Sequence, residues 1–336
     1  MYAVRLHEFG PAENLVYEEV PDPVPSAGQV RISVEAAGVH LLDTALRAGT
    51  AGGGPVAPPE LPTIPGREVA GTVDAVGPEV DETWIGKRVV VHLGPVPGGY
   101  AELAVANVKS LYVIPDHLDG ATAVATIGTG RTAAGVLEQA ALGKDDVVLI
   151  TAAAGGMGSL FVQAARNVGA VVVGVAGGPE KVQQVRDLGA QYAVDYKATD
   201  WPEQVKEQLD GRDVTVVLDG VGGENGQRAF ELLGIGGRLL MFGWSGGGPV
   251  QLTTQDLMNR GLSATWAIGP KLMRRLRELE ATALRESIEG RWTPLLTRFP
   301  LSKAPDAHRA LEHRETVGKV VLLPPELTFT PCQGPP

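Results

Sequence analysis

The chain has 336 residues, of which 44% are hydrophobic and 20% are charged, and its formal net charge is −10. This length exceeds the size at which a single hydrophobic core stops growing, so two domains are expected. The acidic balance, with no basic stripe, argues against nucleic acid or an anionic membrane surface as the main partner. The single cysteine, Cys332, excludes an internal disulfide and a thiolate metal cluster.

The first segment, MYAVRLHEFGPAENL, carries charges throughout and has no apolar signal-peptide core. No later segment offers about eighteen uninterrupted apolar residues, the length that a membrane helix needs. We therefore expect a cytoplasmic protein whose partner is neither a membrane nor a nucleic acid.

Residues 1–118 carry short β-type runs separated by proline and glycine, with few helix signals. The runs are Val30–Val34, Val69–Val76, Arg88–Leu93 and Leu103–Val105. They predict a compact, barrel-like β domain. The loop 50–62 combines three consecutive glycines with four prolines, and it is expected to lie over the mouth of the active site.

From residue 119 to residue 268, strands alternate with helices, as is typical of a parallel sheet covered on both faces. The predicted strands are Val147–Ile150, Val171–Val175, Tyr192–Val194, Val214–Leu218, Arg238–Phe242 and Ser263–Ala267. We therefore predict a second domain at 119–268. An amphipathic segment at 271–289 follows, and a strand at 319–323 is expected to return to the first domain, which 269–325 would complete. Residues 326–336 are expected to be a poorly ordered tail.

The most informative stretch of the second domain is a strand that runs into a glycine-rich turn and then a helix. The turn reads Ala153-Ala154-Gly155-Gly156-Met157-Gly158, with glycine at the third and sixth positions of a six-residue fingerprint. The middle glycine lets backbone N–H groups approach a phosphate, and the last lets the helix pack on its strand. The pattern predicts a dinucleotide site, although such turns also occur for packing alone.

The end of the next predicted strand bears on which nicotinamide cofactor binds. An NAD-selective site places an acid about twenty residues beyond the turn. Gly177 and Gly178 stand there instead, and Lys181 follows at the start of the next helix. We therefore predict NADPH rather than NADH, with the room at Gly177 and the charge of Lys181 serving the 2′-phosphate. The alternative is that Lys181 is a solvated residue beside Glu180.

Ten short segments occur in a particular order along the chain. They are AAGVHLLDTALRAG (36–49), PTIPGREVAGTVDAVGPEV (62–80), GKRVVV (86–91), GGYAELAVA (98–106), GTGRTAAGVL (128–137), AAAGGMGSL (152–160), LGAQYAVDYKATD (188–200), VLDGVGGE (217–224), GGRLLMFGWSGG (236–247) and HRETVGKVVLLP (313–324). In this order they resemble the medium-chain dehydrogenase/reductase superfamily and, within it, the zinc-independent quinone oxidoreductases related to zeta-crystallin. The resemblance implies an α/β fold, in which a GroES-like β-barrel catalytic domain accompanies a Rossmann domain, a doubly wound parallel sheet that binds NADPH. It also implies a homodimer joined edge to edge through a strand such as 262–267.

The resemblance implies cofactor contacts at matching positions. They are Thr132, Ala154, Gly155, Gly156, Met157, Gly158, Gly177, Lys181, Tyr196, Phe242, Gly243 and Arg314. The glycine turn would line the pyrophosphate, Lys181 and Tyr196 the 2′-phosphate end, and Phe242 with its neighbour the nicotinamide. Thr132 would lie near the nicotinamide ribose, and Arg314 would reach back from the C-terminal segment. Tyr196, Phe242 and Arg314 could instead be ordinary packing or surface residues.

Zinc is not expected in this chain, because catalytic zinc needs three protein ligands and an open position. Where zinc members of the superfamily have a cysteine after Ala-Gly-Val, this chain has His40, and where they have Gly-His-Glu it has Gly66-Arg67-Glu68. The segment 92–99 is too short for a four-cysteine zinc lobe. A site improvised from His40, Glu68 and His92 is the alternative.

Without a metal, these residues predict direct hydride transfer to a small electrophile, a quinone or another α,β-unsaturated carbonyl, which spreads the charge to a distant oxygen. His40 is the candidate hydrogen-bond or proton donor, since it occupies the position that faces the nicotinamide in the family, where many members have asparagine. Asp43 is expected beside the substrate pocket, bracing the loop around Arg67. Trp244 is expected to narrow the pocket or to pack on another subunit.

Two alternatives to a quinone reductase stay open. One is a reductase of enoyl thioesters or alkenals. The other is a non-catalytic NADPH-binding protein with a crystallin-like or redox-sensing role.

Overall fold

The computed structural model describes residues 1–50, 58–95 and 97–325, and its contacts divide the chain into two compact units. Unit 1 comprises residues 1–124, residues 298–315 and the chain from residue 320, and unit 2 comprises residues 125–297 and 316–319. Most of the loop 50–62, and all of the predicted tail with Cys332, lie outside the described residues. No helix in the described ranges is long and apolar enough to cross a membrane.

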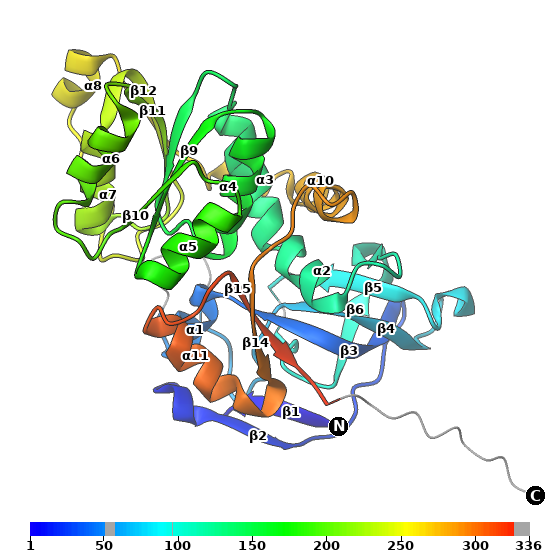
Figure 1. Ribbon diagram of the computed structural model, residues 1–336. Helices are drawn as coiled ribbons and strands as arrows, with labels where there is room; N and C mark the ends of the chain where they lie inside the picture. Colours follow the sequence, from blue (N-terminus) through cyan, green and yellow to red (C-terminus); the bar gives the residue numbers. More distant parts are fainter. Residues whose placement is uncertain (51–57, 96, 326–336) are drawn as a thin grey trace, which may run out of the picture. The chain divides into compact units, whose positions relative to one another are not determined.

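Unit 1 is organised around β-sheets. Its strands are β1 (Tyr2–Leu6), β2 (Leu15–Glu19), β3 (Gln29–Val39), β4 (Glu68–Val76), β5 (Arg88–His92), β6 (Leu103–Asn107), β7 (Tyr112–Val113), β14 (Leu296–Pro300) and β15 (Lys319–Leu323), and its helices include α1 (Leu41–Arg47) and α11 (Ala304–Glu312). The first residues of β14 and β15, 296–297 and 319, belong to unit 2. The larger sheet has the order β14-β15-β3-β4-β5-β7, with β6 paired to β3, while β1 pairs with β2. The two strands from the C-terminal part of the chain are orange and red in Figure 1.

The strand β3 shows why the sheet forms and how it positions a candidate residue. Its first half alternates buried Val30 and Ile32 with more exposed Arg31, as the period of a half-buried strand requires. The strand continues beyond the predicted run to Val39, because both faces of its second half are covered. The chain then enters α1 at once, so His40 lies at a strand–helix junction.

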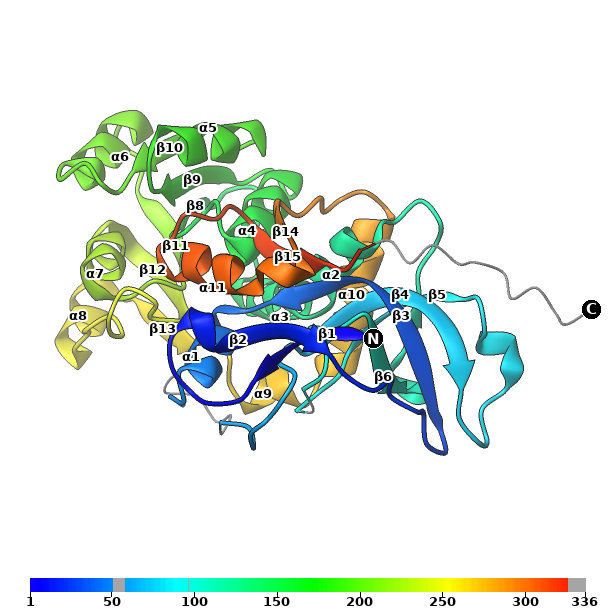
Figure 2. The same cartoon turned by 90° about the horizontal axis from the view of Figure 1, so that it is seen from below.

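Unit 2 alternates strands and helices. Its strands are β8 (Val147–Ile150), β9 (Val171–Ala176), β10 (Tyr192–Asp195), β11 (Val214–Asp219), β12 (Leu233–Met241) and β13 (Ser263–Trp266). Its helices are α3 (Thr129–Ala140), α4 (Gly156–Asn167), α5 (Pro179–Asp187), α6 (Trp201–Leu209), α7 (Gly223–Glu231), α8 (Thr254–Arg260), α9 (Pro270–Met273) and α10 (Leu276–Ile288), and α2 (Gly120–Ile127) crosses the boundary between the units. The strands pair in parallel in the order β10-β9-β8-β11-β12-β13, which can be followed in Figure 2.

Both faces of this parallel sheet are buried, which explains its continuous apolar strands. Val148 and Ile150 on one face of β8 belong to a core shared with α3, α4, α5 and α10. Leu149, between them, belongs to a second core shared with α6 and α7. Helices on both faces of a parallel sheet make the doubly wound Rossmann arrangement, so the predicted fold class is confirmed for this unit.

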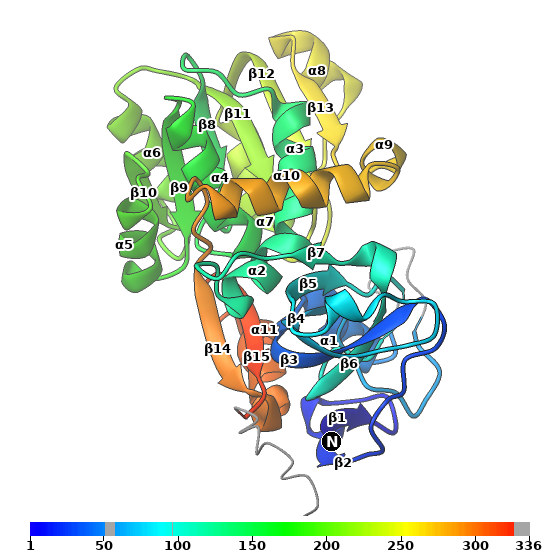
Figure 3. The ribbon, with the colours of Figure 1, turned by 90° about the vertical axis from the view of Figure 1, so that its right-hand side faces the viewer.

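The helices after β13 differ from the sequence expectation in two respects. Residues 269–297 were expected to complete the first domain, whereas their contacts place them in unit 2. There α10 packs on α3, as Figure 3 shows, and Arg131 Nη1 lies 2.7 Å from Glu280 Oε1. The predicted amphipathic segment is also two helices, α9 and α10, rather than one.

Candidate active site

The predicted dinucleotide turn lies at the carboxyl end of the parallel sheet, where β8 passes into α4. The chain turns through Ala152 in the left-handed conformation (φ 47°), and α4 begins at Gly156 with Gly155 as its N-cap. Gly155 has no side chain with which to cap the helix, so no side chain at this position competes with an anion for the positive end of the α4 dipole. Ligands of open parallel sheets bind at such carboxyl ends, and the turn fits a dinucleotide pyrophosphate.

Close backbone packing requires glycine within this turn. A Cβ at Gly158 would lie 2.2 Å from the carbonyl oxygen of Ala152, and one at Gly155 would lie 3.0 Å from the same oxygen. Gly318 covers the turn from another segment of unit 2, because its N–H donates to the carbonyl of Ala154 at 2.7 Å. The half-buried side chain of Met157 packs against the core below. The side of this turn that faces the protein is therefore closely packed against backbone atoms.

The corner after β9 carries the residues predicted at the 2′-phosphate end. A Cβ at Gly177 would lie 2.6 Å from Tyr196 Oη, so the tyrosine ring occupies the space over this glycine. Lys181 is the third residue of α5, the helix that begins at this corner. The Nζ of Lys197 lies 3.8 Å from the Cβ position of Gly178. Lys197 adds a cation that the sequence analysis missed.

A carboxylate also lies at this corner. Asp195 Oδ1 accepts the N–H of Gly178 at 2.9 Å and the N–H of Lys197 at 3.0 Å. The acid of an NAD-selective site follows the second strand, where this chain has Gly177. Asp195 instead ends β10, and one of its oxygens holds two backbone turns together, a role that no local pattern in the sequence indicates.

The residues predicted at the nicotinamide follow β12. The ring of Phe242 is buried and packs edge-on against Phe161, with centroids 5.2 Å apart. Because this side chain belongs to the hydrophobic core, a cofactor contact at Phe242 would have to come from its backbone. A Cβ at Gly243 would lie 2.8 Å from the carbonyl oxygen of Gly220. The ring of Trp244 lies 4.9 Å from that of Trp266 on β13, and both are partly exposed.

Two further cofactor candidates lie apart from these groups along the chain. Thr132 is on α3, where its hydroxyl donates to the carbonyl of Gly128 at 3.1 Å. Arg314 follows α11 in unit 1, with an exposed side chain and a left-handed backbone (φ 59°). Their cofactor contacts stay predictions.

The strand order of unit 2 reverses between β8 and β11, and a buried polar contact joins the ends of these strands. The hydroxyl of Thr151 donates to Asp219 Oδ1 at 2.7 Å, and the N–H groups of Val221 and Gly222 donate to the same carboxylate. Burial raises the pKa of Asp219. These residues fix the loops at the switch point, and the sequence analysis assigned them no role.

In unit 1, His40 faces a buried carboxylate. Its Nε2 lies 2.8 Å from Oε1 of Glu68, which is fully buried on β4. The distance is that of an ion pair, although the angle falls outside hydrogen-bond geometry. A hydrogen on Nε2 suits this contact, because a lone pair there would face a carboxylate oxygen.

Asp43 is almost fully buried in the first turn of α1, and several donors surround its carboxylate. Oδ2 accepts the backbone N–H of His40 at 2.7 Å and the hydroxyl of Tyr100 at 3.3 Å. Arg67 Nη2 lies 3.5 Å from Oδ1. The Tyr100 hydroxyl also lies 3.1 Å from Nε2 of His308 on α11. We call Asp43, Arg67, Tyr100 and His308 the Asp43 network.

The residues at the zinc positions do not fit a catalytic zinc ion. Within the described ranges, no three histidine, cysteine, aspartate or glutamate side chains are placed together to hold a metal. His40 and Glu68 are in contact with each other, and Nδ1 of His92 accepts the N–H of Gly94 at 3.0 Å. A tetrahedral site needs a third protein ligand. We therefore derive no step through zinc.

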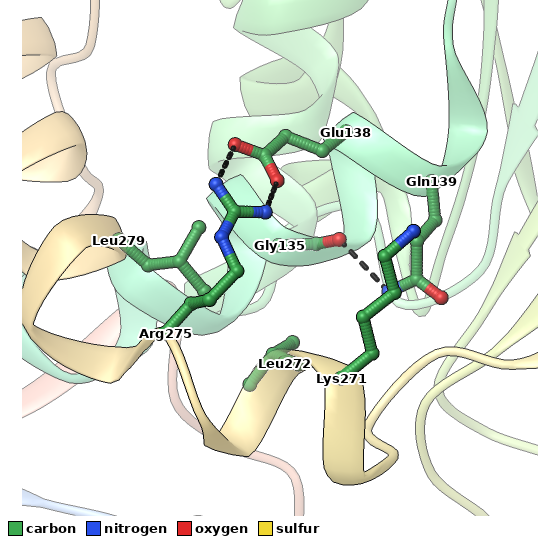
Figure 4. A pocket seen from close by; sticks show the side chains of 7 residues that line it. All are labelled: Gly135, Glu138, Gln139, Lys271, Leu272, Arg275 and Leu279. Atoms are coloured by element: carbon green, nitrogen blue, oxygen red, sulfur yellow. Dashed lines mark hydrogen bonds and ion pairs between the residues drawn. The ribbon is translucent and has the colours of Figure 1, made fainter.

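A separate pocket of about 160 Å³ opens in unit 2 between α3 and the helices α9 and α10. Figure 4 shows Arg275 paired with both oxygens of Glu138, and Gln139 donating to the carbonyl of Gly135. The exposed Lys271 stands at its edge. The arginine is already paired with carboxylates, and we assign this pocket no part in the chemistry.

The fold and the glycine turn define a two-unit, nucleotide-binding oxidoreductase, and comparison with known proteins agrees. Residues 26–116 match the family described as "Alcohol dehydrogenase GroES-like domain", and residues 156–284 match the family described as "Zinc-binding dehydrogenase". The chain is 34% identical to the 2-haloacrylate reductase of Burkholderia sp., over 96% of this chain and 98% of the relative. It is 33% identical to the quinone oxidoreductase of Sus scrofa, again over 96% and 98%.

Among solved structures, the chain resembles Escherichia coli quinone oxidoreductase complexed with NADPH. The TM-score is 0.82 at 28% identity, over 96% of this chain and 100% of that one. The chain therefore belongs to the medium-chain dehydrogenase/reductase superfamily, in the branch that contains the quinone oxidoreductases, and it is an oxidoreductase. The predicted family and fold class are both confirmed.

Proposed function

We propose that this chain is an NADPH-dependent reductase that acts without zinc on a quinone or another α,β-unsaturated carbonyl. The observation that carries the proposal is the contact between His40 and Glu68. The residues at the zinc-ligand positions of metal-dependent relatives here face each other, and one of them is an imidazole, a group that can carry a proton. The two relatives named above support this reaction class, since quinones and 2-haloacrylates are both conjugated, electron-poor acceptors.

When bound, the reduced nicotinamide would supply a hydride, that is, one proton together with two electrons. The residues of unit 2 then have the task of binding it: the backbone of the Gly155–Gly158 turn at the pyrophosphate, and Lys181 and Tyr196 at the 2′-phosphate. The conjugated acceptor moves its π electrons to the carbonyl oxygen as the hydride arrives, so it needs one proton to finish as the reduced product.

His40 would provide that proton or hydrogen bond in its imidazolium form, which carries hydrogens on both ring nitrogens, because a neutral ring whose one hydrogen faces Glu68 has no other to give. Glu68 would hold the ring in place through Nε2 and stabilise it when it is charged, since a buried carboxylate favours a positive partner. A conjugated acceptor spreads its developing charge, and a hydrogen-bond donor can therefore replace a Lewis acid. Asp43 contributes by fixing the backbone of His40.

The reaction is tested with quinones, enones, alkenals, enoyl thioesters and a 2-haloacrylate, with NADPH oxidation followed by absorbance. We expect turnover of at least one conjugated acceptor. We also expect kcat/KM to fall by roughly 10²-fold in His40→Ala, while His117→Ala, which changes an exposed histidine of the same unit, keeps wild-type activity. NADPH binding without turnover of any acceptor would favour the non-catalytic alternative. Unchanged kcat/KM in His40→Ala would remove His40 from the mechanism.

Cofactor selectivity is tested separately by measuring Kd for NADPH and for NADH. We expect tighter NADPH binding, and we expect Lys181→Gln to weaken NADPH by roughly tenfold while NADH changes little, because a charged hydrogen bond to the phosphate is lost. Lys206→Gln on α6 is the matched control. Equal or tighter binding of NADH by the wild-type chain would contradict the proposal.

We further propose that the chain holds no stoichiometric zinc. Metal analysis of the purified protein is expected to find far less than one zinc per chain, and stoichiometric zinc would contradict the zinc-free mechanism. We also propose a cytoplasmic homodimer. The edge position of β13 in its sheet, and the exposed ring of Trp266 on this strand with that of Trp244 against it, support a self-association surface. Light scattering of the purified chain gives its mass.

A further inference from the structure

The helices α1 and α11 of unit 1 are joined by a buried chain of polar side chains. Tyr100 and His308 are both 0% exposed and Asp43 is 3% exposed, so water cannot replace their partners. The Tyr100 hydroxyl lies between the other two, at 3.3 Å from Asp43 Oδ2 and 3.1 Å from His308 Nε2. A polar chain this deeply buried specifies one arrangement only if its donors and acceptors match.

The direction of the hydrogen bonds follows from the available protons. An ionised carboxylate only accepts, so the single proton of the Tyr100 hydroxyl is donated to Asp43. The phenolic oxygen must then accept from His308, whose Nε2 carries a hydrogen. Burial lowers the pKa of His308 to about 4, so the ring is neutral and its Nδ1 is unprotonated. Nδ1 is buried without a hydrogen-bond partner among the described residues, which agrees with this tautomer.

The hydrogen-bonded series of His308, Tyr100 and Asp43 ends at the backbone of His40, the candidate proton donor. The Asp43 oxygen that accepts from Tyr100 also accepts the backbone N–H of His40 at 2.7 Å. His40 is the N-cap of α1, and its ring is the one that faces Glu68. A shift of the Asp43 carboxylate therefore moves the backbone that carries the imidazole.

We propose that Tyr100 and His308 are positioning residues, which fix Asp43 and through it hold the imidazole of His40 against Glu68. Their effect on turnover rests on the proposed function, but their effect on the His40 ring does not. Removal of the Tyr100 hydroxyl would leave the Asp43 carboxylate with one hydrogen-bond donor fewer. The backbone at the junction between β3 and α1 would then be less firmly held. Small displacements of a reacting group can cost up to about 10²-fold in rate.

The first test observes the rings directly, in the full chain without cofactor. Long-range ¹H–¹⁵N spectra of the protein labelled at its six histidines report the tautomer of each ring, and His40→Gln identifies the His40 signal. We expect one neutral tautomer of His308 with a hydrogen on Nε2. We expect Tyr100→Phe to shift or broaden the His40 signal, whereas Tyr17→Phe, which also removes one tyrosine hydroxyl from unit 1, leaves it unchanged.

Two further variants separate positioning from general loosening of the helices. His308→Gln keeps an N–H donor for Tyr100 and is expected to preserve the His40 signal, while His308→Met removes the donor and is expected to change it. Glu312→Gln weakens the ion pair with Arg47, which links α1 and α11 elsewhere, and is expected to leave the signal unchanged. The same change in Glu312→Gln as in Tyr100→Phe would overturn the proposal.

Turnover gives the second readout. With an acceptor found in the panel above, Tyr100→Phe and His308→Met are expected to lower kcat roughly tenfold with the KM for NADPH unchanged, and His308→Gln is expected to restore most of it. A wild-type His40 signal in Tyr100→Phe would overturn the proposal whatever its activity. If His40→Gln itself keeps full kcat, the proposed role of His40 fails, while the spectra still decide whether the network positions its ring.

Discussion

Buried titratable side chains make the stability of unit 1 depend on pH. His308 has an ordinary pKa of 6.5, which burial lowers to about 4; the charge of Asp43 opposes the shift and that of Arg47 adds to it. When the pH falls below 6.5, the unfolded chain binds a proton that the folded chain excludes. Stability from this group is therefore complete above pH 6.5 and is lost as the pH falls toward 4.

We predict that lowering the pH from 7 to 5 reduces the free energy of unfolding by about 2 kcal/mol through His308 alone. Urea unfolding at both pH values measures the total change. His308→Gln cannot titrate and is the control, so its loss of stability over this range should be smaller than that of the wild-type chain by this amount. Equal losses in the two proteins would show that His308 is not held neutral.

Sequence reasoning found those residues of the candidate site that a local motif contains. His40, Glu68 and the glycine turn stand in short recognisable segments, and their neighbours along the chain identify them. Tyr100 and His308 are 208 positions apart, and their contact depends on how α11 packs, which no spacing encodes. Lys197 comes shortly after the end of β10, and only the folded structure shows that its Nζ approaches Gly178.

Among the elements, α4 depends most directly on a single small residue. Gly158 lies in the first turn of the helix, where alanine would be favoured by about 1 kcal/mol on helix propensity alone. A Cβ there would meet backbone atoms at 2.2 Å and 2.8 Å, which cannot move aside as a flexible side chain could. The steric cost exceeds the gain in propensity, because overpacking against a rigid neighbour typically costs 1–3 kcal/mol, here about 2 kcal/mol.

We therefore predict that Gly158→Ala lowers the free energy of unfolding by about 1 kcal/mol or more. It should also weaken NADPH binding, since α4 must shift at the end that is proposed to hold the pyrophosphate. Denaturant unfolding and cofactor titration measure the two effects. Gly143→Ala is the matched control, because the nearest atom to its Cβ would be 4.0 Å away. A Gly158→Ala chain as stable as the wild type would contradict the steric argument.

In unit 2, sequence patterns were sufficient to predict most strands but missed one helix boundary. Five of the six strands of unit 2 were predicted to within a residue at each end, because fully buried parallel strands are continuous apolar runs rich in β-branched residues. The exception is β12, which begins at Leu233, five residues before the predicted start at Arg238. The break between α9 and α10 was missed, since residues 274 and 275 are both arginines and neither glycine nor proline marks it. Arg275, the N-cap of α10, is held there by carboxylates of Glu138 and Glu278, and such tertiary contacts leave no local signature.

For the molecule as a whole, the proposed cofactor is an anion that binds a chain of net charge −10. Its binding therefore depends on the local positive groups of unit 2 rather than on the general field of the protein. A ligand that binds only the folded state stabilises it by about 2.7 kcal/mol at 100 times its Kd. For a chain of this length, that corresponds to a rise of about 4 °C in Tm.

We predict this rise with NADPH, measured by thermal unfolding, and a smaller one with NADH at the same concentration. Lys181→Gln should reduce the NADPH effect toward that of NADH, whereas Lys206→Gln should not. Identical shifts with both cofactors would argue against recognition of the 2′-phosphate.

The position of β15 in its sheet also bears on how the protein is made. Residues 319–323 lie between β14 and β3, so a strand formed from residues 29–39 lacks one neighbour until nearly the whole chain has been translated. Every strand of the parallel sheet in unit 2 has by then left the ribosome. We expect the middle of the polypeptide to fold first. Until β15 has been synthesised, part of one edge of β3 stays unpaired, and we expect chaperones to protect it from aggregation.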